Sequence, residues 1–266
     1  MAQIFPRSAN QLPLVLAAAA LLVPACAGLF VWYFLSPRFL EVGYRPVQPV
    51  PYSHRLHAGE LQLDCRYCHA SVETSPVANV PPTATCMNCH KTVARTSEAL
   101  APVRESAASG RPLRWLRVHK LPDYAYFNHS VHINRGVSCA SCHGKINEME
   151  VVRHDQPLSM GWCLDCHRNP ENSLRPLDQI TNLDYAPKDL DRAGFYKQLL
   201  EAGTPAGEIA EVILGEKPAV EVGGVEDLLA MAEKKFGASV TQREVGSQLK
   251  KHWQIQPPES CAACHR

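Results

Sequence analysis

The chain has 266 residues, with 27 basic and 26 acidic residues and a formal net charge of +1. This balance gives no electrostatic basis for binding nucleic acid or a strongly acidic partner. The chain carries 21 prolines and only 7% aromatic residues, which is unusual for a compact, regular α or β domain. We therefore expect a loop-rich chain whose core needs more than its own apolar side chains.

The first element in chain order is an apolar segment, Leu12 to Leu35, that carries no charged residue. It is long enough to cross a bilayer as one helix, which takes about 20 residues. A cleaved signal peptide is the alternative, with Arg7 as its basic region, but the apolar run is too long and no A-x-A-like site closes it. We expect a retained anchor at 12–35 after a cytoplasmic N-terminus at 1–11. Cys26 is then an inert thiol in the membrane.

A Pro-rich linker at 36–51 leads into the part of the chain that holds the other ten cysteines. They form five Cys-x-x-Cys-His motifs, in which two thiols can add to the vinyl groups of a haem while the histidine binds its iron. A lone Cys-x-x-Cys could belong to a zinc site, a redox pair or a disulfide framework, but none of these requires the histidine. The sequence therefore predicts five c-type haems, held by Cys65, Cys68 and His69; Cys86, Cys89 and His90; Cys139, Cys142 and His143; Cys163, Cys166 and His167; and Cys261, Cys264 and His265.

The first four motifs form a duplicated tetrahaem region, 52–175, whose halves 52–126 and 127–175 repeat at an interval of roughly 75 residues. In each half, two histidines three residues apart precede two motifs. One iron has a single axial position left beside its motif histidine, so both histidines of a pair cannot serve the same haem. A helical i, i+3 spacing places both rings on one face. We expect four distal iron ligands, with a solvent-facing member of each pair as the alternative: His54, His57, His129 and His132.

One iron then still needs a distal ligand. Met160 is the first candidate, because thioether ligation occurs in c-type cytochromes and raises the potential. His119 is the second. His252 lacks a partner histidine and falls on an expected helix, and His154, flanked by charged residues, is expected at the surface.

The segment 176–253 has no Cys-x-x-Cys-His motif and is expected to be a helical insert. Helices are predicted from near Thr204-Pro205, over residues 228–236, and from a capping box at Thr241-x-x-Glu244 to near Trp253. The insert could pack over the haem chain or dock a partner. Residues 254–266 carry the fifth motif. The expected fold class is mainly α with extensive irregular loops, a class III-like multihaem c-type cytochrome packed around five haems with one N-terminal transmembrane helix.

Three segments carry a resemblance to a known family: PVPYSHRLHAGELQLDCRYCH, RVHKLPDYAYFNHSVHINRGVSCASCHG and PLSMGWCLDCHRNPE. They resemble the membrane-anchored pentahaem cytochrome c subunit of alternative complex III, and more broadly the class III multihaem cytochromes. The resemblance covers the anchor, all five motifs and the terminal CAACHR, and is weak in the insert. It implies three kinds of partner: an iron–sulfur/molybdopterin-oxidoreductase-like subunit, polytopic quinol-binding membrane subunits and further cytochrome c subunits.

Haem attachment needs reduced thiols outside the cytoplasm, so we expect the haem region on the periplasmic side of a bacterial cytoplasmic membrane. The expected function is electron relay from iron–sulfur clusters to a periplasmic cytochrome c, a copper protein or a terminal oxidase, with no enzyme activity of the chain alone. A small multihaem quinol dehydrogenase that feeds a periplasmic reductase is the alternative. A haem enzyme would need a five-coordinate iron, which the surplus of histidines disfavours.

Overall fold

The computed structural model describes residues 6–35 and 41–265. Residues 1–5 of the expected N-terminus, residues 36–40 of the expected linker and Arg266 lie outside the described residues. Within the described ranges the chain is mainly helical and has no β-strand, only isolated bridges at Ala125–His265 and Val137–Leu174. The expected fold class is confirmed in this respect. The α-helices are α1 (Leu12–Phe34), α2 (Cys65–Cys68), α3 (Thr83–His90), α4 (Ala101–Ser109), α5 (His129–Ile133), α6 (Cys139–His143), α7 (Met160–Arg168), α8 (Arg192–Glu201), α9 (Ala206–Leu214), α10 (Val225–Phe236), α11 (Gln242–His252) and α12 (Cys261–Cys264).

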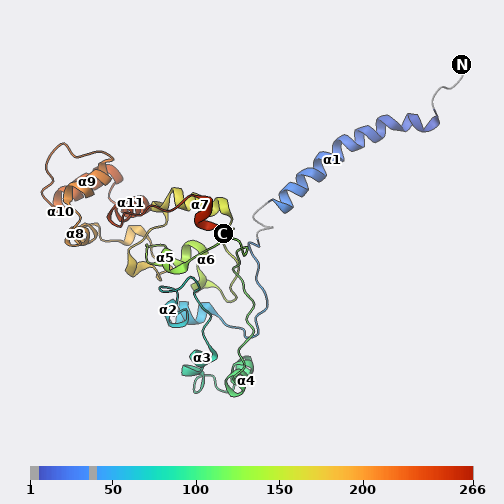
Figure 1. Cartoon of the computed structure of the whole chain (residues 1–266), viewed down its shortest axis with the longest axis horizontal. Coiled ribbons are helices and arrows are strands. Elements are labelled where there is room, and N and C mark those ends of the chain that lie inside the picture. The colour runs from blue at the N-terminus through green and yellow to red at the C-terminus, as the bar shows by residue number, and fades with distance from the viewer. Residues whose placement is uncertain (1–5, 36–40, 266) are drawn as a thin grey trace.

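Helix α1 is a single apolar helix that continues through Pro24 and has no buried residue. With the preceding turn it forms an apolar stretch, Ser8–Phe34, of mean hydropathy 2.5. Figure 1 shows it projecting away from the rest of the chain. Its length and composition fit a membrane span, as they would fit a signal sequence, so the anchor stays a prediction.

The motif-bearing region between residues 52 and 175 has little apolar core of its own. One small buried cluster joins Val72, Ile133 and Ile180. Several large apolar side chains are instead exposed, among them Leu61 (60%), Val77 (63%) and Val93 (59%). Because proteins of this size normally bury such side chains, the region lacks the apolar material that would pack its short helices together.

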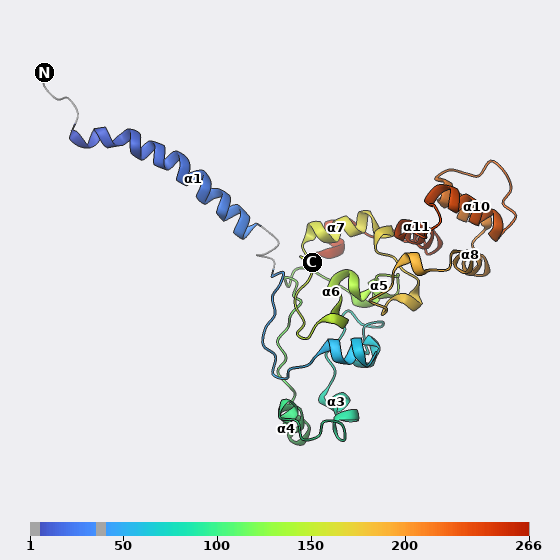
Figure 2. The ribbon, with the colours of Figure 1, turned by 180° about the vertical axis from the view of Figure 1, so that it is seen from behind.

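The largest buried cluster lies in the insert, where α8, α9, α10 and α11 pack around one another (Figure 2). Three side chains in its centre are completely buried: Tyr196, Ile209 and Leu228. The helices expected in this segment are present, with α9 starting at Ala206 after an N-cap at Pro205. Helix α8, capped by the Asp191 carboxylate, was not expected from the sequence.

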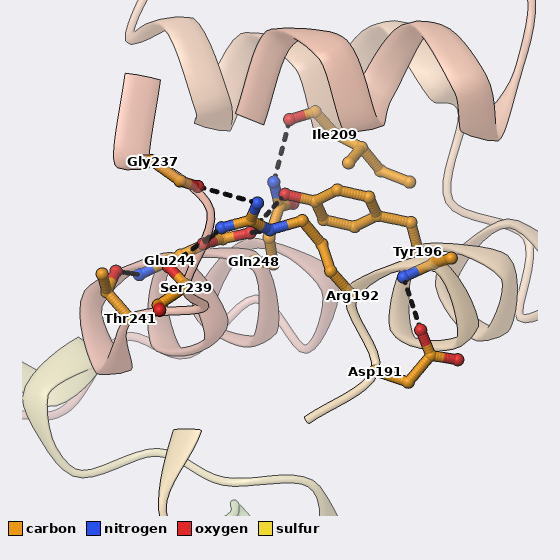
Figure 3. Close-up of polar contacts among 10 residues, drawn as sticks. Asp191, Arg192, Tyr196, Ile209, Gly237, Ser239, Thr241, Glu244 and Gln248 are labelled. Carbon is orange, nitrogen blue, oxygen red and sulfur yellow. Dashed lines mark hydrogen bonds and ion pairs between the residues drawn. The ribbon is translucent and has the colours of Figure 1, made fainter. Parts of the chain in front are cut away.

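A buried ion pair ties the insert together (Figure 3). The Arg192 guanidinium donates two hydrogen bonds to the Glu244 carboxylate, at 2.7 and 2.9 Å, and the Tyr196 hydroxyl donates a third at 2.8 Å. Arg192 also donates to the carbonyls of Gly237 and Ser239. The Glu244 side chain is fully buried, so these donors replace the water that a carboxylate otherwise needs.

Helix α11 joins the insert to the second half of the tetrahaem region. It packs on the turn η5 (Pro170–Asn172), which follows α7. The Lys250 ammonium lies 2.9 Å from the Glu171 carboxylate, and a Cβ added at Gly246 would collide with the Glu171 carbonyl. The insert is therefore packed against the motif region, which is one of the two roles expected for it.

Candidate haem-binding sites

Each Cys-x-x-Cys-His motif lies on or at the end of a short helical turn, α2, α3, α6, α7 or α12. Residues i, i+3 and i+4 share one face of a helix, so the two thiols and the imidazole of a motif point to the same side. The side chains of Asp64, Ser138 and Ser159 cap three of these turns by accepting a hydrogen bond from a backbone N–H. The local sequence thus builds the turn that presents the thiols.

All ten motif cysteines are free thiols, and contacts between them give the order of the motifs in space. We call the motifs the first to fifth sites, in chain order. The Cys68 thiol interacts with Cys86, so the first and second sites are neighbours. The Cys142 thiol interacts with Cys166, so the third and fourth sites are neighbours. Burial, followed by this interaction, raises the pKa of the Cys142 thiol to about 12.

Two further contacts join these pairs into one row. The thiol of Cys65 interacts with that of Cys139, which places the first site beside the third. The Cys163 thiol interacts with Cys264, which places the fourth site beside the fifth. The spatial order is therefore second, first, third, fourth, fifth. Helices α3, α2, α6 and α7 follow this order along the molecule in both views (Figures 1 and 2).

The second histidine of each pair faces the motif histidine of an even-numbered site. The ring centroids of His57 and His90 are 6.2 Å apart, as are those of His132 and His167. An imidazole nitrogen binds a first-row metal ion at about 2 Å, so two rings across one iron have centroids roughly 6 Å apart. Both distances suit axial ligation of one iron from its two sides.

The first histidine of each pair faces an odd-numbered site instead. The rings of His129 and His143 lie 6.4 Å apart and are almost parallel, with an interplanar angle of 3°. His54 has His69 as its strongest charged neighbour: burial first, and His69 second, lower the pKa of His54 to about 4. The two members of each pair therefore lie near different motifs.

Most of these histidines are oriented by a hydrogen bond from Nδ1 to a backbone carbonyl. In a metal-binding histidine such a bond fixes the ring and leaves Nε2 free for the ion. The carbonyl oxygens lie 2.6 to 3.3 Å from Nδ1 of seven residues: His57, His69, His90, His129, His132, His167 and His265. The Nδ1 atoms of His54 and His143 are buried without a partner among the described residues.

An aromatic ring supports each histidine pair, a feature that the sequence analysis missed. Tyr52 stacks on His57 with ring centroids 4.4 Å apart, and Phe127 stacks on His132 at 4.5 Å. Each ring also meets the other member of its pair edge-on. An aromatic residue two positions before each pair was the available signal, and its repetition in both halves could have identified the role.

The distal side of the fifth site is the least defined. Met160 is 64% exposed at the start of α7, three residues before Cys163, whose thiol interacts with Cys264 of the fifth site. His252 forms a 2.6 Å hydrogen bond with Thr204 inside the insert, away from any motif. Because His252 is engaged in this hydrogen bond, Met160 and His119 remain as the candidates that the sequence offered for the fifth distal ligand.

The expectation that His154 lies at the surface is wrong. Its side chain is buried, at 2% exposure, although Arg153 and Asp155 flank it. The cause is a long-range pairing of the backbone: His154 N–H donates to the Tyr44 carbonyl, and Gly43 N–H donates to the His154 carbonyl. Both ring nitrogens of His154 lack a partner among the described residues.

His119 lies between His154 and the third site. Its ring centroid is 5.3 Å from that of His154 and 4.3 Å from that of His143, which it meets edge-to-face at 88°. Burial first, and the neighbouring histidines next, lower the pKa of His119 to about 4 and that of His143 to about 3. Both rings are therefore neutral at pH 7, as a metal-binding imidazole must be.

These residues fit c-type haem. One cavity at the third site is lined by both thiols, Cys139 and Cys142, and by both facing histidines, His129 and His143. The exposed apolar side chains of the motif region are what a macrocycle would cover. The described residues contain no cluster of three or more His, Cys, Asp or Glu side chains that could hold a metal ion by themselves.

Two comparisons agree with this geometry. Residues 125–185, which contain the second histidine pair and the third and fourth sites, match the family described as cytochrome c7 and related cytochrome c. The chain is also similar to the menaquinone reductase multihaem cytochrome c subunit of Nitratidesulfovibrio vulgaris, with 34% identity over 150 residues that cover 48% of this chain and 70% of that protein. With its repeated motifs and facing histidines, the chain belongs to the multihaem c-type cytochromes and is an electron-transfer protein.

Proposed function

We propose that this chain is a membrane-anchored pentahaem electron relay in a quinol-oxidising complex of the alternative complex III type. The observation that carries the proposal is the row of sites, in which each site has a cysteine that interacts electrostatically with a cysteine of the next site. Such a row gives electrons one path from end to end. A site for substrate chemistry would instead need a vacant axial position.

In this proposal each haem is held by the two thiols and the histidine of one site. The distal ligands are His54 at the first site, His57 at the second, His129 at the third and His132 at the fourth. Met160 completes the fifth site opposite His265; His119, the second candidate from the sequence, lies beside His143 of the third site instead. The ring separations of 6.2 to 6.4 Å support three of these pairings directly.

A bound haem supplies reversible uptake of one electron at its iron. The protein holds each iron between two strong ligands, so that its coordination does not change with redox state. Thioether links would hold each haem in place, and the hydrogen bonds from Nδ1 to backbone carbonyls hold the imidazole rings in their orientation. Tyr52 and Phe127 stack on His57 and His132 and restrict the movement of these two imidazole rings. All four effects favour fast electron transfer and oppose bond-making chemistry.

The setting of the relay is proposed from the resemblance and from the relative. The anchor would hold the haem region on the periplasmic side of a bacterial cytoplasmic membrane. Electrons would enter from an iron–sulfur/molybdopterin-oxidoreductase-like subunit, next to polytopic quinol-binding subunits and further cytochromes. They would leave to a periplasmic cytochrome c, a copper protein or a terminal oxidase. A relative that belongs to a menaquinone reductase supports a quinone-linked membrane complex.

The test is to isolate the complex containing this chain from native membranes in mild detergent. Intact mass spectrometry of the chain should give five covalent haems. Quinol should reduce these haems in the complex and fail to do so after the partner subunits are stripped away. Equal reduction of the stripped chain would overturn the relay proposal in favour of a small multihaem quinol dehydrogenase. Fewer than five haems would overturn the assignment of the sites.

A further inference from the structure

His143 is the exception among the five motif histidines. At the other four, His69, His90, His167 and His265, Nδ1 lies within hydrogen-bonding distance of a backbone carbonyl. Nδ1 of His143 is buried and has no partner among the described residues. A histidine that binds a metal almost always donates its second ring N–H, and a buried donor left without an acceptor destabilises the folded protein. The third site therefore needs an acceptor that the backbone does not supply.

The ring of His119 offers that acceptor. It is the nearest ring to His143, at 4.3 Å between centroids, and its Nε2 atom is also buried and without a partner among the described residues. The two unpartnered nitrogens are complementary, because in neutral imidazoles Nδ1 of His143 can donate its hydrogen and Nε2 of His119 can accept it. At this ring separation, rotation about the side-chain torsions can bring the two nitrogens within hydrogen-bonding distance.

Axial ligation of the third iron by His119 would require displacing a better placed residue. The two axial positions there are taken by His143 and by His129, which lies parallel to it at 6.4 Å. The ring centroids of His119 and His143 are 4.3 Å apart, closer than the roughly 6 Å between two rings across one iron, so His119 is a neighbour of His143 and not its opposing ligand. The ring of the buried His154 lies next to His119, with the two centroids 5.3 Å apart.

We propose that Nε2 of His119 accepts a hydrogen bond from Nδ1–H of His143 and that His119 is the positioning residue of the third haem. The inference rests on the proposed assignment of haem to this site. The hydrogen bond would fix the plane of the His143 ring and increase its electron donation to the iron, which stabilises the oxidised state. The potential of the third haem would then depend in part on a side chain that accepts from its motif histidine. At the other four sites a backbone carbonyl is the acceptor.

The test compares two substitutions in the full-length chain within its complex. His119→Phe keeps a planar ring but removes the acceptor, and His119→Gln restores an acceptor through its amide oxygen. With His119→Phe we expect one of the five midpoint potentials to rise and one low-spin electron paramagnetic resonance signal to shift. The haem count and the other four potentials should not change. His119→Gln should return most of the shift toward the wild-type value.

Three results would overturn the proposal. A high-spin signal in His119→Phe would show that His119 is an axial ligand. Unchanged midpoint potentials would show that it only packs against His143. A lowered midpoint potential would show that His119 does not accept a hydrogen bond from His143 but donates one at the third haem. His252→Phe is the matched control, because His252 is a hydrogen-bonded histidine in the insert. If His119→Phe is not assembled, His119→Leu replaces it in the same comparison. Failure of this test with five low-spin haems present would leave the relay proposal intact.

Discussion

The two histidines of the second pair face different sites, so a substitution at one of them should change one haem and leave its neighbour unchanged. We expect His132→Met to raise the midpoint potential of one haem, because a thioether ligand stabilises reduced iron relative to an imidazole. A redox titration followed at the haem absorption bands measures this. His252→Met should leave all potentials unchanged. Two haems shifting together would contradict the assignment of His132 to the fourth site alone, which rests on the ring distance of 6.2 Å between His132 and His167.

The buried carboxylate of Glu244 makes a second prediction for a single residue. Glu244→Gln leaves the Arg192 guanidinium, whose side chain is only 10% exposed, without its charged partner. Removing one member of a buried pair costs about 3 kcal/mol or more, and calorimetric melting of the haem-loaded chain should show a clear loss of stability. Glu201→Gln removes a partner from an exposed pair and should change stability by less than about 0.5 kcal/mol. Equal effects of the two substitutions would contradict a structural role for the buried pair.

Residues were predictable from the sequence where covalent chemistry or short spacing constrains them. The motif histidines follow their cysteines directly, and the i, i+3 spacing of each histidine pair predicts two ligands on one face of a helical turn. His154 and Glu244 could not be predicted in this way. Burial of His154 depends on a backbone pairing with Tyr44, which is far away in the sequence. By sequence, Glu244 belongs to a local capping box, but in the structure its carboxylate is bound by Arg192.

Helix α11 approaches η5 so closely that only glycine fits at position 246. A Cβ there would collide with the Glu171 backbone, which cannot move as a flexible side chain can. We expect Gly246→Ala to destabilise the chain by about 1–3 kcal/mol through overpacking, measured as a loss in melting temperature. Gly207→Ala on α9 is the matched control: nothing lies near its Cβ, so helix propensity should stabilise it by about 0.5–1 kcal/mol. A stabilised Gly246→Ala would show that α11 does not pack on η5.

Elements were predictable when their ends carry a local signal. The Thr241 hydroxyl accepts the expected hydrogen bond from Glu244 N–H and starts α11 where the capping box placed it. Helix α8 has a comparable signal in Asp191, which accepts hydrogen bonds from two N–H groups. Its sequence has no strong apolar periodicity that would predict a helix. The turn η2 (Arg55–Glu60), on which His57 lies, is a π-helix, and its widened turn has no sequence signature.

For the whole molecule, the number of sites was predictable but their order in space was not. Chain order would place the first site at one end of the row. The structure instead places the second site there, because the duplicated halves meet through the first and third sites, at Cys65 and Cys139. Two repeats related by duplication can pack through any of their faces, and sequence spacing carries no information about which faces meet. This order decides which haem can be lost without breaking the relay.

Removal of the third haem should divide the row into two separate pairs of haems. The double substitution Cys139→Ala and Cys142→Ala leaves the second and first sites on one side and the fourth and fifth on the other. Electron transfer slows steeply with distance, so quinol reduction of the intact complex should reduce only two of the four remaining haems in the fast phase seen by stopped-flow absorbance. The other two should follow in a much slower phase.

The matched control removes a haem from the end of the row. Cys86→Ala with Cys89→Ala deletes the second site and leaves the first, third, fourth and fifth sites in contact. All four remaining haems should then be reduced in the fast phase, with the same haem count by mass as in the third-site variant. Because both variants lose one haem and two thiols, a difference between them reports the order of the sites alone. Fast reduction of all four haems in the third-site variant would contradict a single row and require a second path around the third site.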